Sequence, residues 1–209
     1  MNWMRPIEFR SKLHWMITRP SKSKAALAFA ALVLASANKA SGFEEKGYSW
    51  NFEKNPIETH FIICENNAPV GASKLIQQAA AKWNYSKLHI NFDEDDCPAQ
   101  RPINYVEFTE FQDKGETGFT ATRNDGTKEM KSCRIQFNKD KFWNLSAGAP
   151  DKDENDLFSV ALHEFGHCVG LDDLKAPGSV MQGRLNAGEM LRELTPDDVA
   201  GRNKIYGAP

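Results

Sequence analysis

Two histidines and a glutamate lie close together in the sequence His-Glu-Phe-Gly-His at residues 163–167. If this segment is helical, each residue turns the chain by about 100°, so His163 and His167 lie one turn apart on the same face. Two imidazoles in this arrangement can both bind one Zn²⁺. Glu164 lies beside that face, where its carboxylate can take a proton from a zinc-bound water. The pattern therefore predicts a zinc site with its own general base.

The residues after His167 indicate how a third ligand can reach the same ion. Gly170 follows three residues later, where a helix can end in the left-handed conformation that glycine adopts without penalty. Such an end turns the chain back, and Asp173 comes three residues further along. Its carboxylate can be the third ligand and leave the fourth position to water. The neighbouring Asp172 is the alternative third ligand.

The rest of the chain predicts the elements that hold this motif. Apolar residues repeat at helical spacing in residues 72–83, and capping residues precede a helix at 157–170. Thr-Pro-Asp-Asp at residues 195–198 predicts the start of a C-terminal helix. Strands are predicted at residues 59–64, 88–92, 103–108, 118–122 and 133–137, the last two as a hairpin or looped pair. Strands followed by helices favour a single α+β domain.

The full pattern H-E-x-x-H-x-x-G-x-x-D at residues 163–173 is followed, eight residues after its Asp, by Met181 in the sequence Gly-Ser-Val-Met. This arrangement resembles the metzincin metalloproteases, and among them most closely the matrixins. The resemblance runs from about Trp50 to Gly207. It implies the zincin fold, with a twisted mixed sheet of about five strands, one antiparallel edge strand, an active-site helix and a C-terminal helix.

The same resemblance implies roles for residues outside the motif. Met181 is expected to form a rigid apolar floor below the metal ligands. One of Asp197 and Asp198 is expected to brace the methionine turn. Compensation of the helix dipole is the other interpretation of these two acids, and both interpretations can hold.

The chain departs from the matrixin pattern at the third ligand, where matrixins have His and this chain has Asp173. An Asp there is similar to snapalysin, a small secreted bacterial metzincin, and the family spacing favours Asp173 over Asp172. We therefore expect one catalytic Zn²⁺ held by His163, His167 and Asp173. Residues 151–155 begin like a calcium loop but lack the Gly and the closing Glu of an EF-hand, so calcium has no support in the sequence.

The resemblance implies a secreted zinc endopeptidase. A peptide is expected to add as an extra strand along the predicted edge strand Gly118–Arg123. We expect Glu164 to take a proton from the zinc-bound water and to pass it to the leaving amine. The alternative is a secreted, non-catalytic binding module that retains the metzincin fold; Asp173 favours it and the intact Glu164 argues against it. The path of residues 185–194, which border the substrate, is not predictable.

Four cysteines suit two disulfides in an exported protein. On a helical wheel Cys168 lies about 140° from His163, so it faces away from the expected metal. We favour its pairing with Cys133, on the strand that should neighbour this helix, which leaves Cys64 with Cys97. Four cysteines allow three connectivities, and the sequence alone does not select one.

The N-terminal residues indicate export. Basic residues precede an apolar run of 13 residues, 25–37, that ends in Ala-Ser-Ala. This is the layout of a secretory signal peptide, and the run is shorter than the ~20 residues of a membrane-spanning helix. We predict a signal peptide at 1–37, a flexible lead-in at 38–49 and a catalytic domain at 50–209, secreted or periplasmic. Translation from Met16 instead of Met1 leaves a signal of more usual length.

The composition fits one ordinary globular domain, with 41% hydrophobic and 26% charged residues among 209. The formal net charge is -2, but residues 1–37 hold six Lys or Arg and one acid, so the remainder carries -7. This balance disfavours a nucleic-acid partner. We expect a monomer that acts on a protein or peptide substrate and has no stable membrane anchor.

Overall fold

The structure is a computed structural model that describes residues 42–50, 53–94 and 97–209. The predicted signal peptide at 1–37, both candidate start residues and the first part of the lead-in lie outside the described residues. No described helix has the length and apolar character needed to cross a membrane.

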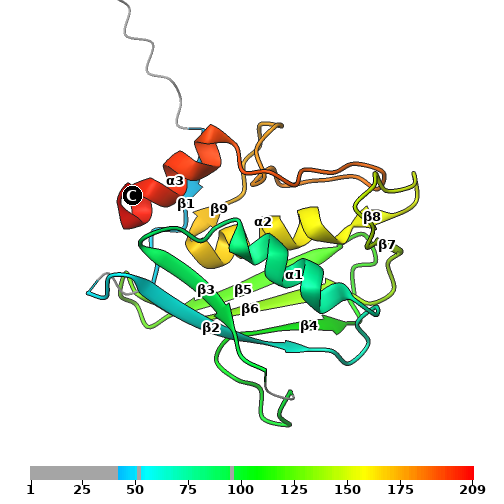
Figure 1. Ribbon diagram of the computed structural model, residues 1–209, viewed down its shortest axis with the longest axis horizontal. Helices are drawn as coiled ribbons and strands as arrows, with labels where there is room; N and C mark the ends of the chain where they lie inside the picture. Colours follow the sequence, from blue (N-terminus) through cyan, green and yellow to red (C-terminus); the bar gives the residue numbers. More distant parts are fainter. Residues whose placement is uncertain (1–41, 51–52, 95–96) are drawn as a thin grey trace, which may run out of the picture. The chain divides into compact units, whose positions relative to one another are not determined.

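A five-stranded sheet forms the base of the fold (Figure 1). Its strands lie in the order β3-β2-β4-β6-β5; the first four are parallel, and β5 is antiparallel to β6. The bounds are β2 Ile57–Cys64, β3 Leu88–Phe92, β4 Tyr105–Thr109, β5 Gly118–Asn124 and β6 Met130–Asn138. Because β5 ends this order, one of its backbone edges has no neighbour in the sheet. The mixed sheet with one antiparallel edge strand is thereby confirmed.

Helices α1, Ala72–Ala81, and α2, Leu157–Val169, cover the same face of this sheet (Figure 1). The buried positions of α1 recur at helical spacing, as its sequence predicts. Between the helices and the sheet lies one hydrophobic core, in which Phe61, Phe137 and Phe165 are fully buried. The His-Glu-Phe-Gly-His motif is therefore carried by a helix that is packed against the sheet along most of its length.

The two ends of α2 form where the sequence predicts them. At its start the Asp156 side chain accepts a hydrogen bond from the backbone amide of Ser159 (3.0 Å), which makes Asp156 the N-cap. At its end Gly170 adopts φ 105°, a left-handed conformation that a side chain would strain. This turn sends the chain back into strand β9, Leu171–Asp172.

Residues 42–49 differ from the expected flexible lead-in, because they contain strand β1, Glu44–Glu45. It pairs antiparallel with β9, and the Lys46 amide donates to the carbonyl oxygen of Gly170 (2.9 Å). Lys204 of the C-terminal helix α3, Pro196–Tyr206, forms an ion pair with Glu45 (3.3 Å). A strand of two residues has too little alternation to be recognised in a sequence.

Two disulfides are present, Cys64–Cys97 and Cys133–Cys168, which is the connectivity favoured above. The second joins β6 to α2, so the Cys168 side of the helix faces the sheet. The remaining short strands, β7 Trp143–Asn144 and β8 Asn155–Asp156, pair in parallel just before α2. They fix the direction in which the chain enters the helix.

Candidate metal centre and active-site cleft

The two histidines of α2 are held by backbone carbonyl groups. The Nδ1 of His163 lies 2.9 Å from the carbonyl oxygen of Val180, and the Nδ1 of His167 lies 3.0 Å from that of Leu171. A carbonyl oxygen only accepts hydrogen bonds, so each Nδ1 is the protonated nitrogen. In a neutral ring this leaves the lone pair on Nε2, the atom that can bind a metal ion.

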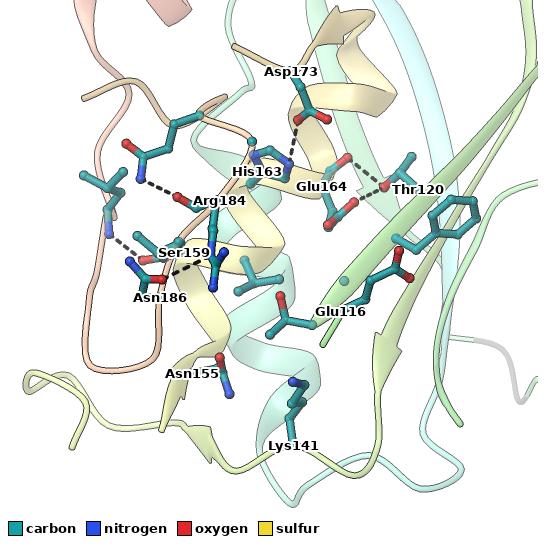
Figure 2. Close-up of a pocket in the computed structure, with 18 of the residues that line it drawn as sticks. Glu116, Thr120, Lys141, Asn155, Ser159, His163, Glu164, Asp173, Arg184 and Asn186 are labelled. Carbon is teal, nitrogen blue, oxygen red and sulfur yellow. Dashed lines mark hydrogen bonds and ion pairs between the residues drawn. The ribbon is translucent and has the colours of Figure 1, made fainter. Parts of the chain in front are cut away.

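Asp173 brings a carboxylate to these two nitrogens. Its Oδ1 lies 3.4 Å from the Nε2 of His163 (Figure 2) and 3.5 Å from the Nε2 of His167. Two ligands at 2.0–2.1 Å from a tetrahedral zinc ion lie about 3.3 Å apart, so this spacing fits a shared Zn²⁺. The donor set of two imidazoles and one carboxylate also fits zinc chemistry. Glu164 lies close by, because one ligand atom from each of His163, Glu164 and His167 lies within 4.8 Å of the others.

Asp172 has a different environment from its neighbour. Its Oδ1 accepts hydrogen bonds from the Nζ of Lys46 (3.3 Å) and from the backbone amide of Asp173 (3.1 Å). Asp172 is thus engaged with β1, whereas Asp173 faces the histidines. The geometry favours Asp173 in the choice that the sequence leaves open, and Lys46 and Asp172 hold the backbone that carries it.

In the metal-free protein, the contact between the histidines and Asp173 favours the charged forms of His163 and Asp173. Burial of His163 opposes its protonation, but hydrogen bonding to Asp173 and the charge of Glu164 outweigh burial and raise the pKa of His163. Hydrogen bonds from His163 and then His167 hold the pKa of Asp173 well below its usual range. Asp173 is therefore an anion throughout the neutral range, as a metal ligand must be.

Glu164 is buried, with 5% of its surface exposed, and its carboxylate is oriented by the edge strand. The hydroxyl of Thr120 donates to its Oε2 (2.6 Å; Figure 2). A methyl group on Gly118 would lie 2.5 Å from its Oε1, so only glycine leaves room for the carboxylate there. The strand that should bind a peptide is therefore the strand that positions the candidate base.

The methionine turn is braced by Asp198, which is fully buried at the start of α3. The carboxylate of Asp198 accepts hydrogen bonds from the Ser179 hydroxyl (2.5 Å) and the Val180 amide (3.2 Å). Val180 in turn holds His163 through its carbonyl oxygen. Met181 is fully buried and packs so closely on Gly166 of α2 that a Cβ at that position would collide with its sulfur. The bracing and floor roles implied by the family likeness fit these contacts.

A cleft of about 810 Å³ opens above this cluster. One side is β5 with the residues that precede it, the floor is α2, and the opposite wall is residues 182–191. Arg192 anchors the end of this wall: its guanidinium forms an ion pair with the buried Asp156 and donates to the carbonyl oxygen of Ala147 (2.8 Å). Asp156 holds the pKa of Arg192 above its usual value.

The structure brings together His163, Glu164, His167 and Asp173, with Gly170 and Met181 in supporting positions. Thr120, Gly118, Lys46 and Arg192 were not singled out by sequence reasoning. Alternation along the edge strand was the available signal for Thr120 and Gly118, since both point toward α2. Two further histidines lie elsewhere, on β2 and β3, paired with acids there.

Comparison with known proteins identifies the family. The sequence model described as Matrixin matches residues 50–207. The chain is 42% identical to matrix metalloproteinase-16 of Homo sapiens over 74 residues, 35% of this chain and 12% of that protein. It is 39% identical to matrix metalloproteinase-25 of Mus musculus over 143 residues, 64% of this chain and 23% of that protein. The chain thus spans less than a quarter of these curated relatives. With its matrixin match across residues 50–207 and the mixed sheet described above, the chain belongs to the matrixin family.

Proposed function

We propose that this protein is an exported zinc-dependent endopeptidase. One observation carries the proposal: an Asp173 oxygen lies within 3.5 Å of the Nε2 atoms of both histidines at the floor of an open cleft, beside the buried Glu164. The matrixin family and the metalloproteinase names of the relatives support the same activity.

We assign His163, His167 and Asp173 as the residues that hold the ion. A Zn²⁺ bound there supplies Lewis acidity, which polarises the substrate carbonyl and lowers the pKa of a water molecule. The snapalysin-like Asp173 adds a negative charge that a third imidazole would not, so we expect weaker Lewis acidity than with three histidines.

The remaining steps belong to the chain's own groups. The open edge of β5 can pair with an extended peptide through backbone hydrogen bonds, which tolerate many sequences. Glu164, fixed by the Thr120 hydroxyl, takes a proton from the attacking water and delivers it to the leaving amine. The hydrogen bond to Oε2 leaves Oε1 available for this transfer.

Export is part of the same proposal. It is supported by the signal-like residues 1–37 and by the two disulfides, which persist in oxidising compartments.

The test combines metal content with cleavage. We expect one zinc per chain by elemental analysis and cleavage of casein that o-phenanthroline abolishes. Glu164→Gln should retain the zinc and lose cleavage by at least about a thousandfold, because the base is absent. Zinc without cleavage by the unaltered protein would support the non-catalytic binding module instead. Absence of zinc would contradict both.

A further inference from the structure

The wall of the cleft opposite β5 is fixed at both ends. Near the metal residues, the Gly183 amide donates to the carbonyl oxygen of Leu174 (3.0 Å). At the far end, the Leu191 amide donates to the hydroxyl of Ser159 (2.7 Å), in the first turn of α2. The residues between these anchors therefore border the N-terminal half of α2 in a defined position.

Arg184 lies in this wall, and with respect to the described residues most of its hydrogen-bond donors have no acceptor. Its Nε donates to the amide oxygen of Asn186 (3.2 Å; Figure 2), and its side chain lines the cleft. Asn186 is itself fixed, because its side-chain nitrogen donates to Glu189 (3.1 Å). Within the described part of the chain, no acidic side chain pairs with Arg184. Its two terminal nitrogens form a planar fork that suits a carboxylate.

The other two cations lining the cleft are engaged, among the residues that the structure describes. The Nζ of Lys141 donates to the carbonyl oxygens of Lys114 (2.8 Å) and Gly115 (3.1 Å). Lys46 pairs with Asp172 at 3.3 Å. Arg184 is thus the cleft-lining cation that has a charge and a donor fork to offer to a ligand.

The direction of β5 shows which part of a substrate meets Arg184. Gly118 lies next to both Val160 and Glu164, and Thr120, two residues further along β5, contacts Glu164. From Gly118 to Thr120, β5 therefore runs away from Val160. A peptide antiparallel to β5 therefore has its residues after the scissile bond on the Val160 side. That is the side along which the wall runs, from Gly183 to Ser159. In Figure 2, Arg184 lies on the opposite side of α2 from Thr120, with its guanidinium next to Asn186.

Acidic groups line the outer part of the cleft and limit where a substrate carboxylate can lie. Asp113, Glu116 and Asp153 are exposed there. They repel an anionic side chain near them, whereas Arg184 attracts one to the wall opposite β5. The electrostatic field of these residues therefore favours a substrate that places a single acidic side chain next to Arg184.

We propose that Arg184 makes this protein select peptides with Asp or Glu at one position after the scissile bond. The inference rests on the proposed peptidase function and names its substrate class. The catalytic steps are unchanged; the guanidinium binds the substrate carboxylate and orients the peptide.

Peptide binding tests the proposal without turnover. In the inactive Glu164→Gln background, a neutral eight-residue peptide is scanned with Glu at each position, and dissociation constants are measured by fluorescence anisotropy. We expect Glu at one position to tighten binding about tenfold over Gln, as for a partly desolvated charged hydrogen bond. Adding Arg184→Gln should remove this ratio, and Lys152→Gln, an exposed neighbour of the wall, should leave it unchanged. The ratio should also decrease with added salt.

Cleavage-site profiling on a peptide library separates the two proposals. Acidic residues enriched at one position after the cleaved bond, and lost in Arg184→Gln, would support the role of Arg184. Cleavage without this enrichment, or with enrichment that survives Arg184→Gln, would overturn it and leave the peptidase intact. No cleavage and no zinc would overturn the peptidase function itself, while the Glu scan would still test Arg184.

Discussion

Helix α2 has a polar cluster at each end, and the two clusters differ in how their charges are satisfied. At the start, Asp156 is buried and meets Arg192, Ser159 and Asn144. Further along, the side chain of Asp173 is 57% exposed and meets two imidazole nitrogens at the floor of a cleft. In the first cluster the cation Arg192 pairs with the carboxylate. In the second, the Nε2 atoms of His163 and His167 and the Oδ1 of Asp173 are directed at one another.

This difference distinguishes a structural cluster from a candidate functional one. Arg192 completes the first cluster, and it also donates to backbone carbonyl oxygens at residues 146, 147 and 148. In the second cluster a backbone carbonyl oxygen holds Nδ1 of each imidazole, so the ring orientation is fixed with Nε2 directed at Asp173. Substitutions at the two ends should therefore affect different properties.

The largest expected effects come from altering the aspartate at each end. Asp156→Asn should lower the free energy of unfolding by about 3 kcal/mol, because Arg192 loses its buried partner. Denaturant unfolding measures this change. The zinc affinity of the folded variant should remain that of the unaltered protein.

Asp173→Asn should show the opposite pattern. Loss of the anionic ligand should weaken zinc binding by on the order of 100-fold or more, measured by competition with a chelator. The unfolding free energy of the zinc-free protein should change far less than in Asp156→Asn. Equal effects of both substitutions on both properties would contradict the comparison.

Gly118→Ala tests the position of the candidate base. The added methyl group would lie 2.5 Å from Oε1 of Glu164, so the carboxylate must move. A displacement of this size should reduce kcat/KM for peptide cleavage on the order of 100-fold. Zinc content should stay at one per chain. A variant with unchanged kcat/KM would show that Glu164 can work from another position.

The sequence could predict elements whose signal is local. The HExxH pattern, Gly170 and the Thr195-Pro196 start of α3 each depend on spacing or capping within a few residues, and the structure has the helices there. The wall at residues 182–191 has no regular periodicity, so its path was not predictable. Its position depends on contacts between segments far apart in the sequence, such as Arg192 with Asp156.

The same limit applies to the partners of the candidate site. Thr120 contacts Glu164 across 44 residues of the chain. Lys46 contacts Asp172 across 126 residues. A single sequence shows that a threonine or a lysine is present, but not which side chain it meets. Sheet register and the β1–β9 pairing determine those contacts.

Thr120→Val should have a moderate effect on catalysis. The substitution keeps the shape of the side chain and removes the hydrogen bond to Glu164 Oε2, so the base is less well oriented. A loss of about tenfold in kcat/KM corresponds to one such bond. Thr122→Val is the matched control, because its hydroxyl contacts Tyr48 instead (2.6 Å). Equal losses in both variants would point to a general weakening of β5.

The smallest expected effect is a pH dependence that arises from His163 and Asp173. The raised pKa of His163 stabilises the folded metal-free protein below about pH 6.5, and this contribution is lost as the pH rises through the folded pKa. The lowered pKa of Asp173 contributes above about pH 4, so both contributions are present between these values. The melting temperature of the zinc-free protein should therefore fall by a few degrees from pH 6 to pH 8, and less in Asp173→Asn. Zinc should reverse the trend, because metal and protons compete for the histidines, so the rise in melting temperature on adding zinc should increase with pH. Parallel curves for the two proteins would mean that the imidazole–carboxylate contact does not stabilise the metal-free fold.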